Sequence, residues 1–104
     1  MRELTPQELQ GILKDPDLVL LDVRMPEEFE IASLPGSLHI PMPEVPNRLG
    51  DLNAGSRIVV LCHHGIRSER VARLLERSGF TDVSHLVGGL DRWADEVDPS
   101  MPRY

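Results

Sequence analysis

The stretch that most constrains the fold joins a buried strand to a helix through a tight polar turn. Residues 58–61 form a continuous apolar run, which is followed directly by Cys62-His63-His64-Gly65-Ile66-Arg67. Residues 68–78 then place apolar and charged side chains with the period of an amphipathic helix. A strand, a turn and a helix in this order predict an α/β unit with Cys62 at the carboxyl end of the strand.

This turn is predicted to present an activated thiol. The backbone N–H groups of a tight turn, and those at the start of the following helix, converge on whatever the turn encloses. A cysteine held there is biased toward its thiolate form. Gly65 is expected to close the turn in a backbone conformation that a residue with a Cβ resists. Arg67 adds a positive charge at the rim, and Ile66 is expected to point away from the enclosed space.

A second buried strand is predicted over residues 18–23. This apolar run carries Asp22 near its end and is followed by Arg24, and its length suits a strand that is covered on both faces. Shorter strands are expected at residues 2–4, 38–40 and 83–87.

Helices are predicted between these strands. Thr5 is expected to cap a helix that begins at Pro6 and stops at Asp15, with Glu8 completing a capping box. Further helices are expected over residues 26–30, 44–49 and 90–96. Strands that alternate with helices predict an α/β fold, in which a mostly parallel central sheet forms the middle of three layers.

The composition limits the cellular setting and the partners. Residues 1–104 are expected to form one domain. The protein is expected to be a monomer. No apolar run approaches the ~18 residues of a membrane span, and residues 1–4 carry no signal-peptide pattern. The single cysteine excludes an internal disulfide, which favours a cytoplasmic location. A net charge of -6 argues against nucleic acid and membrane surfaces as partners.

The polar residues around the turn leave several roles open. Cys62 is either a reactive thiol or a small buried apolar residue at the end of a strand. His63 and His64 are either bases or hydrogen-bond donors at the rim. A metal site built from these three residues lacks the usual tetrahedral ligand spacing, so we expect no metal and no cofactor. His39 and His85 fall in predicted strands and are expected to be structural.

Three segments, in order along nearly the whole chain, resemble signatures of the rhodanese (sulfurtransferase) family. The N-terminal signature corresponds to Leu20-Leu21-Asp22-Val23-Arg24-Met25-Pro26-Glu27-Glu28-Phe29-Glu30, followed by Leu34-Pro35-Gly36-Ser37 and His39-Ile40-Pro41. The active-site loop corresponds to Cys62-His63-His64-Gly65-Ile66-Arg67-Ser68. The C-terminal signature corresponds to Gly88-Gly89-Leu90-Asp91-Arg92-Trp93. The resemblance implies a rhodanese-like α/β/α fold.

The same resemblance implies a persulfide chemistry centred on Cys62. This residue would accept a sulfane sulfur as a persulfide and then pass it to a thiophilic acceptor. Arg67 would help to hold an anionic donor, and the outer sulfur would be cradled by the loop amides, which belong to His63, His64, Gly65, Ile66 and Arg67.

Three further residues are expected to support the loop. Asp22 and Arg24 resemble the family's Asp-x-Arg pair, which implies a buried ion pair beside the active loop rather than catalysis. Ser68, at the start of the following helix, is the third. Arg24 is also expected to pair with Glu28, because the two residues are four positions apart.

The donor implied by the resemblance is a small sulfur-containing anion such as thiosulfate. The acceptor would be cyanide in the test tube, and a thiol or a sulfur-carrier protein in the cell. Residues 98–104 resemble the tail of rhodanese domains that are fused to adenylyltransferases, which load ubiquitin-like sulfur carriers. This tail points to a role in persulfide relay.

Two other functions stay open. Cysteine-dependent phosphatases and arsenate reductases use a similar loop, but with one more residue between cysteine and arginine than the four found here. A shorter loop suits a single sulfur atom better than a phosphoryl group. The other alternative is a non-catalytic rhodanese-like binding module, although such modules commonly lack the cysteine that this chain retains.

Overall fold

A single parallel sheet organises the molecule. The computed structural model describes every residue from Met1 to Tyr104. The sheet has the strand order β1-β5-β4-β2-β3, and all neighbouring strands are parallel. Its strands are β1 (Arg2–Leu4), β2 (Leu18–Asp22), β3 (Leu38–His39), β4 (Arg57–Leu61) and β5 (Asp82–Leu86). The expected α/β fold is therefore confirmed, with a sheet that is parallel throughout.

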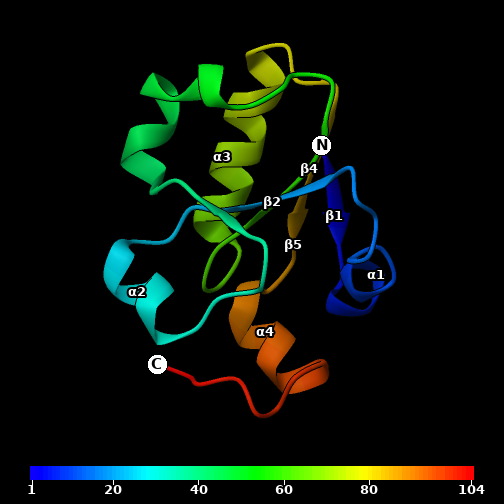
Figure 1. The fold of residues 1–104 in the computed structure, drawn as a ribbon, viewed down its shortest axis with the longest axis vertical. Helices are drawn as coiled ribbons and strands as arrows, with labels where there is room; N and C mark the ends of the chain where they lie inside the picture. The colour runs from blue at the N-terminus through cyan, green and yellow to red at the C-terminus, as the bar shows by residue number, and fades with distance from the viewer.

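Three α-helices and two 3₁₀ helices connect the strands, and a fourth α-helix follows the last strand (Figure 1). The α-helices are α1 (Pro6–Gln10), α2 (Pro26–Ile31), α3 (Ile66–Arg77) and α4 (Gly89–Glu96). The 3₁₀ helices are η1 (Met42–Asn47) and η2 (Leu49–Asp51). None of the helices has the length and apolar character required to cross a bilayer.

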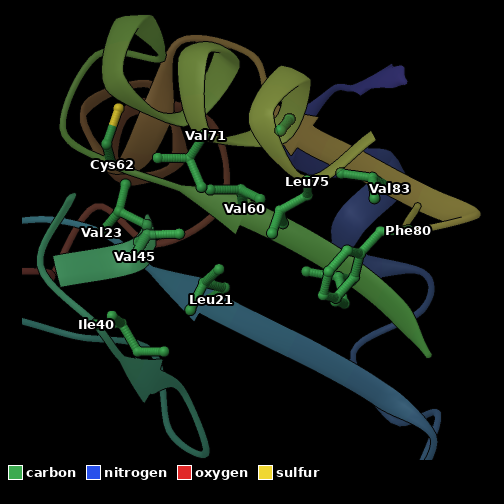
Figure 2. Packing of buried hydrophobic residues seen from close by; sticks show 12 residues of the cluster. Leu21, Val23, Ile40, Val45, Val60, Cys62, Val71, Leu75, Phe80 and Val83 are labelled. Carbon is green, nitrogen blue, oxygen red and sulfur yellow. The ribbon is translucent and has the colours of Figure 1, made fainter. Parts of the chain in front are cut away.

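The two faces of the sheet bury separate apolar clusters. Ile58 and Val60 of β4 pack in a cluster with residues of α3 and η1 (Figure 2). Val59 and Leu61, which point to the opposite face, pack in a second cluster with residues of α1 and α4. This alternation within one strand explains why the strand is apolar at every position.

Three predicted helices differ from the structure by more than one residue or in helix type. Helix α1 ends at Gln10 rather than at Asp15, because glycine follows and is about 1 kcal/mol less favourable than alanine in a helix. The one short helix predicted over residues 44–49 is replaced by two 3₁₀ helices, η1 and η2, in a segment where three prolines limit regular structure. Helix α3 begins at Ile66, two residues before the predicted start, so Arg67 lies in its first turn.

The thiol lies where the connections of the sheet diverge. From β2 the chain continues to β3 on one side, whereas from β4 it continues to β5 on the other side. Strands β2 and β4 are neighbours, so the segments that follow Asp22 and Leu61 meet at one edge of the sheet. In α/β sheets the crevice at such a switch point is the usual place for a ligand.

Candidate active site

Cys62 is buried directly after β4, with only 1% of its surface exposed. Its Sγ accepts hydrogen bonds from the Gly65 N–H at 3.1 Å and from the Ser68 N–H at 3.3 Å. Figure 2 shows the sulfur directed away from Val23 and Val45, which pack below it. The two N–H groups, one from the loop and one from the first turn of α3, therefore converge on the sulfur from the same side of the chain.

The loop is held from behind by the start of α4. The Leu90 N–H donates to the Cys62 carbonyl at 2.9 Å, and the Asp91 N–H donates to the His63 carbonyl at 3.0 Å. These bonds turn the carbonyl groups of the loop toward α4. Gly65 completes the turn with a φ of 97°, as the sequence predicted.

Ser68 links the loop to the sheet beneath it. Its hydroxyl donates to the Gly65 carbonyl at 3.1 Å and lies 3.1 Å from His85 Nδ1. Because a serine hydroxyl has one proton, the Nδ1–H of His85 is the donor in the second bond. His85 is buried in β5, where its Nε2 lies 3.6 Å from the Glu3 carboxylate. This histidine therefore supports the loop through Ser68.

Arg67 forms a two-pronged ion pair with Glu28. Its Nη1 and Nη2 donate to the two carboxylate oxygens at 2.6 and 2.9 Å. The predicted pairing of the Glu28 side chain with Arg24 was wrong, because Arg24 Nη1 donates to the main-chain carbonyl of Glu28 instead, at 3.2 Å. The spacing of four residues between Arg24 and Glu28 did not decide the partner of the Glu28 side chain, because the loop after β4 brings the guanidinium of Arg67 within reach.

The Glu28 carboxylate is fully occupied by hydrogen bonds. Besides the two from Arg67, it accepts one from the Met25 N–H at 3.0 Å and one from the Tyr104 hydroxyl at 2.7 Å. A carboxylate has about four acceptor positions, so none is left over. The hydrogen bonds from Arg67, with smaller contributions from Tyr104 and Met25, lower the pKa of Glu28 to about 2.

This ion pair predicts a loss of stability in acid. The pKa of Glu28 is about 2 in the folded protein and about 4.5 in an unfolded chain, so its stabilising effect is complete above the higher value. The effect is lost as the pH falls from there toward 2. In urea unfolding, Glu28→Gln is expected to show a weaker fall of stability across this window than the wild type. Glu27→Gln, at an exposed position on α2, is the control and should follow the wild type. Equal pH profiles for the wild type and Glu28→Gln would contradict the prediction.

Asp22 and Arg24 form a buried ion pair, and both side chains have 0% exposure. Arg24 Nε and Nη2 donate to the carboxylate, with the shortest contact at 2.7 Å. Arg24 Nη2 also donates to the Ala32 carbonyl at 2.6 Å. With its bond to the Glu28 carbonyl, the guanidinium ties the middle and the C-terminal end of α2 to the end of β2. It thereby places the Glu28 side chain beside the loop.

The remaining loop residues lie toward the surface. His63 packs against the Tyr104 ring, with 4.0 Å between the ring centroids, and its Nδ1 is buried without a partner. Burial and the neighbouring His64 lower the pKa of His63, which keeps the ring neutral. His64 is exposed, and its Nδ1 lies 3.8 Å from the Asp91 carboxylate. Ile66 is 66% exposed and points away from the thiol, toward solvent.

An open cleft of about 230 Å³ lies beside the loop. One wall is the C-terminal tail, which runs past α4 toward α2 (Figure 1). The lining includes His63, Tyr104 and Arg24, together with apolar side chains of α4 and the tail. Cys62 is not among the residues that line this cleft. No group of three or more histidine, cysteine, aspartate or glutamate side chains is arranged to bind a metal ion.

Sequence reasoning missed how two residues contribute to the site. Glu28 was assigned to the wrong arginine, and Tyr104 was placed in an extended tail with no contact to the site. His39 and His85 were expected to be structural, and the contacts that they make are structural, although the sequence did not identify their partners. His39 Nε2 lies 2.7 Å from the Arg24 carbonyl, and Tyr104 accepts a hydrogen bond from Arg24 Nη1 at 3.1 Å. No local pattern marks these residues, because each one reaches the site from a distant part of the chain.

Comparison with known proteins identifies relatives of the whole unit. Residues 5–96 match the family model described as rhodanese-like domain. The chain is 40% identical over 89 residues to the putative sulfur carrier protein YrkF of Bacillus subtilis. It is 41% identical over 93 residues to the adenylyltransferase and sulfurtransferase MOCS3-1 of Zea mays. These alignments cover 86% and 83% of the chain but only 48% and 20% of the two relatives.

The fold has close structural counterparts. A crystal structure of a rhodanese-related protein from Thermoplasma volcanium superimposes with a TM-score of 0.86 at 28% identity. The superposition covers 93% of this chain and 94% of that chain. The chain thus has relatives among sulfur-carrier and sulfurtransferase proteins, and it spans half or less of the length of the two relatives named above.

Proposed function

Because this chain belongs to the rhodanese-like domain family, we propose that it is a sulfurtransferase that works through a persulfide on Cys62. The observation that carries the proposal is the sulfur cradle, in which the Gly65 and Ser68 N–H groups donate to the Cys62 Sγ. A buried thiol without a role would have no need of donors directed at its sulfur. The same donors argue against the alternative in which Cys62 is only a small buried apolar residue.

The proposed transfer has two steps. In the first, the Cys62 thiolate attacks the outer sulfur of a donor such as thiosulfate, the donor S–S bond breaks, and sulfite leaves with the electron pair. In the second, an acceptor thiolate attacks the outer sulfur of the persulfide, and the Cys62 thiolate leaves with the electron pair. The loop amides stabilise the anionic sulfur at each stage, as preorganised donors do for developing charge.

Arg67 is proposed to contact the donor while it remains paired with Glu28. The pair uses two of the five N–H groups of the guanidinium, so three are free for a donor's oxygens. His63, His64, Gly65 and Ile66 are proposed to shape the approach to the sulfur. Ser68, Asp22 and Arg24 hold the loop in place and are not proposed to touch the donor.

The acceptor is proposed to be a thiol or a sulfur-carrier protein. Support comes from the relatives, one of which is named as a putative sulfur carrier and another as an adenylyltransferase and sulfurtransferase. We propose that the chain acts as a monomer in the cytoplasm, without a cofactor and without nucleic acid or membrane partners. Its net charge of -6 supports the last point.

Intact-protein mass spectrometry tests the proposal. After incubation with thiosulfate and removal of excess reagent, the protein is expected to gain the mass of one sulfur atom at Cys62. Addition of cyanide should restore the original mass and release thiocyanate. The persulfide form should yield an alkylated disulfide on treatment with iodoacetamide, rather than an alkylated cysteine. No mass gain with thiosulfate or with an organic sulfane donor would overturn the proposed function.

Replacement of Gly89 by alanine is expected to slow sulfur transfer by at least about tenfold, because small misplacements of a reacting group have large effects on rate. A Cβ at this position would lie 2.3 Å from the His63 carbonyl oxygen and 2.5 Å from that of Cys62. Both atoms belong to the backbone, so the loop itself must move.

Gly36→Ala is the matched control for this change. Gly36 has a φ of 80° and Gly89 one of 63°, but a Cβ at Gly36 would meet nothing within 4 Å. Both variants should therefore lose roughly 1–3 kcal/mol of stability to the left-handed backbone. Only Gly89→Ala should also lose activity, and equal turnover of the two variants would contradict the role given to the start of α4.

A further inference from the structure

We propose that Glu28 determines which sulfur donors the site accepts, by cancelling the charge of Arg67 and so disfavouring doubly charged donors. The inference rests on the proposed sulfur transfer through Cys62 and concerns the specificity of that same site. It assigns to Glu28 a role in selection, in addition to its structural contact with the loop.

The geometry of the ion pair carries the first step of the argument. The guanidinium of Arg67 faces the Glu28 carboxylate through two hydrogen bonds, at 2.6 and 2.9 Å. The side chains of Arg67 and Glu28 have 29% and 19% exposure, so little solvent screens the pair. A charge at contact distance opposes the field of Arg67 at any point farther away, and an approaching donor meets the pair rather than a free cation.

The carboxylate cannot easily turn away to free the arginine. Its other hydrogen bonds come from the Met25 N–H and the Tyr104 hydroxyl, which approach different oxygens. Burial raises the pKa of Tyr104 to about 12, so this residue stays a neutral donor. Rotation of the Glu28 side chain would break all of these bonds together.

Two further arginines, which line the neighbouring cleft, are also paired with carboxylates. Arg24 is buried against Asp22, and Arg103 contacts the carboxylates of Asp91 and Asp95. His63 is neutral for the reason given above. Since the chain as a whole has a net charge of -6, a dianion also meets a repulsive field from the rest of the protein.

The consequence is a preference among donors of the same chemistry. Thiosulfate carries two negative charges, whereas benzenethiosulfonate carries one, because a phenyl group replaces an anionic oxygen. In both reactions the Cys62 thiolate takes the outer sulfur and the donor S–S bond breaks. The electron pair leaves with sulfite in the first case and with benzenesulfinate in the second. The second charge of thiosulfate is therefore the only electrostatic difference that the site must distinguish.

The test compares kcat/KM for the two donors, with cyanide as the acceptor, in the wild type, Glu28→Gln and Glu27→Gln. Removal of one negative charge beside Arg67 should raise the ratio of thiosulfate to benzenethiosulfonate by about tenfold in Glu28→Gln. Glu27→Gln removes the same charge from the same helix at an exposed position, and its ratio should stay within about twofold of the wild type. A merely structural role of Glu28 would lower both kcat/KM values together and leave the ratio unchanged, which would overturn the inference.

A measurement on the wild type covers the case in which Glu28→Gln does not fold. If the charge of Arg67 is cancelled, added salt should screen the repulsion of the dianion and raise the ratio of thiosulfate to benzenethiosulfonate. A ratio that falls with salt would show that Arg67 attracts donors as a free cation, and would overturn the inference. Failure of the proposed function is distinguishable from both results, because neither donor would then load sulfur onto the wild-type protein.

Discussion

Replacement of Cys62 by serine is expected to abolish sulfur transfer and to leave the fold intact. Cys62 is the only cysteine of the chain, so one thiol must carry all of the covalent chemistry. A serine hydroxyl is a far weaker nucleophile than a thiolate at neutral pH and cannot form a persulfide. The hydroxyl is close to the thiol in size and can still accept from the Gly65 and Ser68 N–H groups, so the loop should keep its shape.

The measurement combines activity with unfolding. Thiocyanate production from thiosulfate and cyanide should fall to the background rate, while the urea midpoint stays near that of the wild type. Ser56→Ala, at a turn before β4 and outside the site, is a control for handling and should retain activity. Sulfur transfer by Cys62→Ser above about one tenth of the wild-type rate would show that the chemistry does not pass through this residue.

Replacement of Arg24 by alanine is expected to cause the largest loss of stability, about 3–5 kcal/mol. The change leaves the Asp22 carboxylate buried with no opposite charge, and both side chains of the pair have 0% exposure. It also removes the bonds to the Glu28 and Ala32 carbonyls that tie α2 to the sheet. A domain of this size is typically stable by roughly 5–15 kcal/mol, so a large share would be lost.

Arg48→Ala is the matched control for this experiment. Arg48 also pairs with carboxylates, those of Asp51 and Glu44, but these side chains are partly or largely exposed to solvent. Exposed pairs of this kind contribute roughly 0–1 kcal/mol, so the urea midpoint of Arg48→Ala should hardly move. A loss of stability in Arg24→Ala as small as that in the control would mean that Asp22 finds another partner or becomes protonated at little cost.

The two arginines near the loop have different roles, which the structure separates clearly. Arg24 lies wholly inside the protein and binds carbonyl groups as well as Asp22, so its loss is expected to act on stability. Arg67 is partly exposed and paired with Glu28 beside the thiol, so its charge is expected to act on donor choice. Both arginines bind α2. Arg24 donates to main-chain carbonyls of this helix, and Arg67 pairs with the side chain of Glu28 on the same helix.

Features that depend on neighbouring residues were predictable from the sequence. The capping box between Thr5 and Glu8 joins residues three positions apart, and both of its hydrogen bonds are present. The burial of β4 on both faces and the cysteine at its end follow from a short apolar run next to a polar turn. The left-handed conformation of Gly65 follows from the need to reverse the chain there. In each case the geometry of a few consecutive residues decides the result.

Partners from distant parts of the chain were decided by the tertiary structure alone. Arg67 and Glu28 are 39 positions apart, and Tyr104 and Glu28 are 76 positions apart. The spacing in the sequence predicted Arg24 as the partner of Glu28. That prediction was wrong because β2 and β4 are neighbours in the sheet, so the segment after β4 brings Arg67 to Glu28.

The sequence by itself therefore determined that a strand, a cysteine-bearing turn and a helix are present, since local backbone preferences and apolar periodicity act over a few residues. It did not determine which acid neutralises Arg67, which backbone donors hold the Cys62 carbonyl, or what lies beneath Ser68. These contacts depend on how β2, β4, β5 and α4 pack against one another. The charged groups and hydrogen-bond donors around the thiol are therefore determined by contacts between segments that are distant in the sequence. No local pattern specifies these contacts.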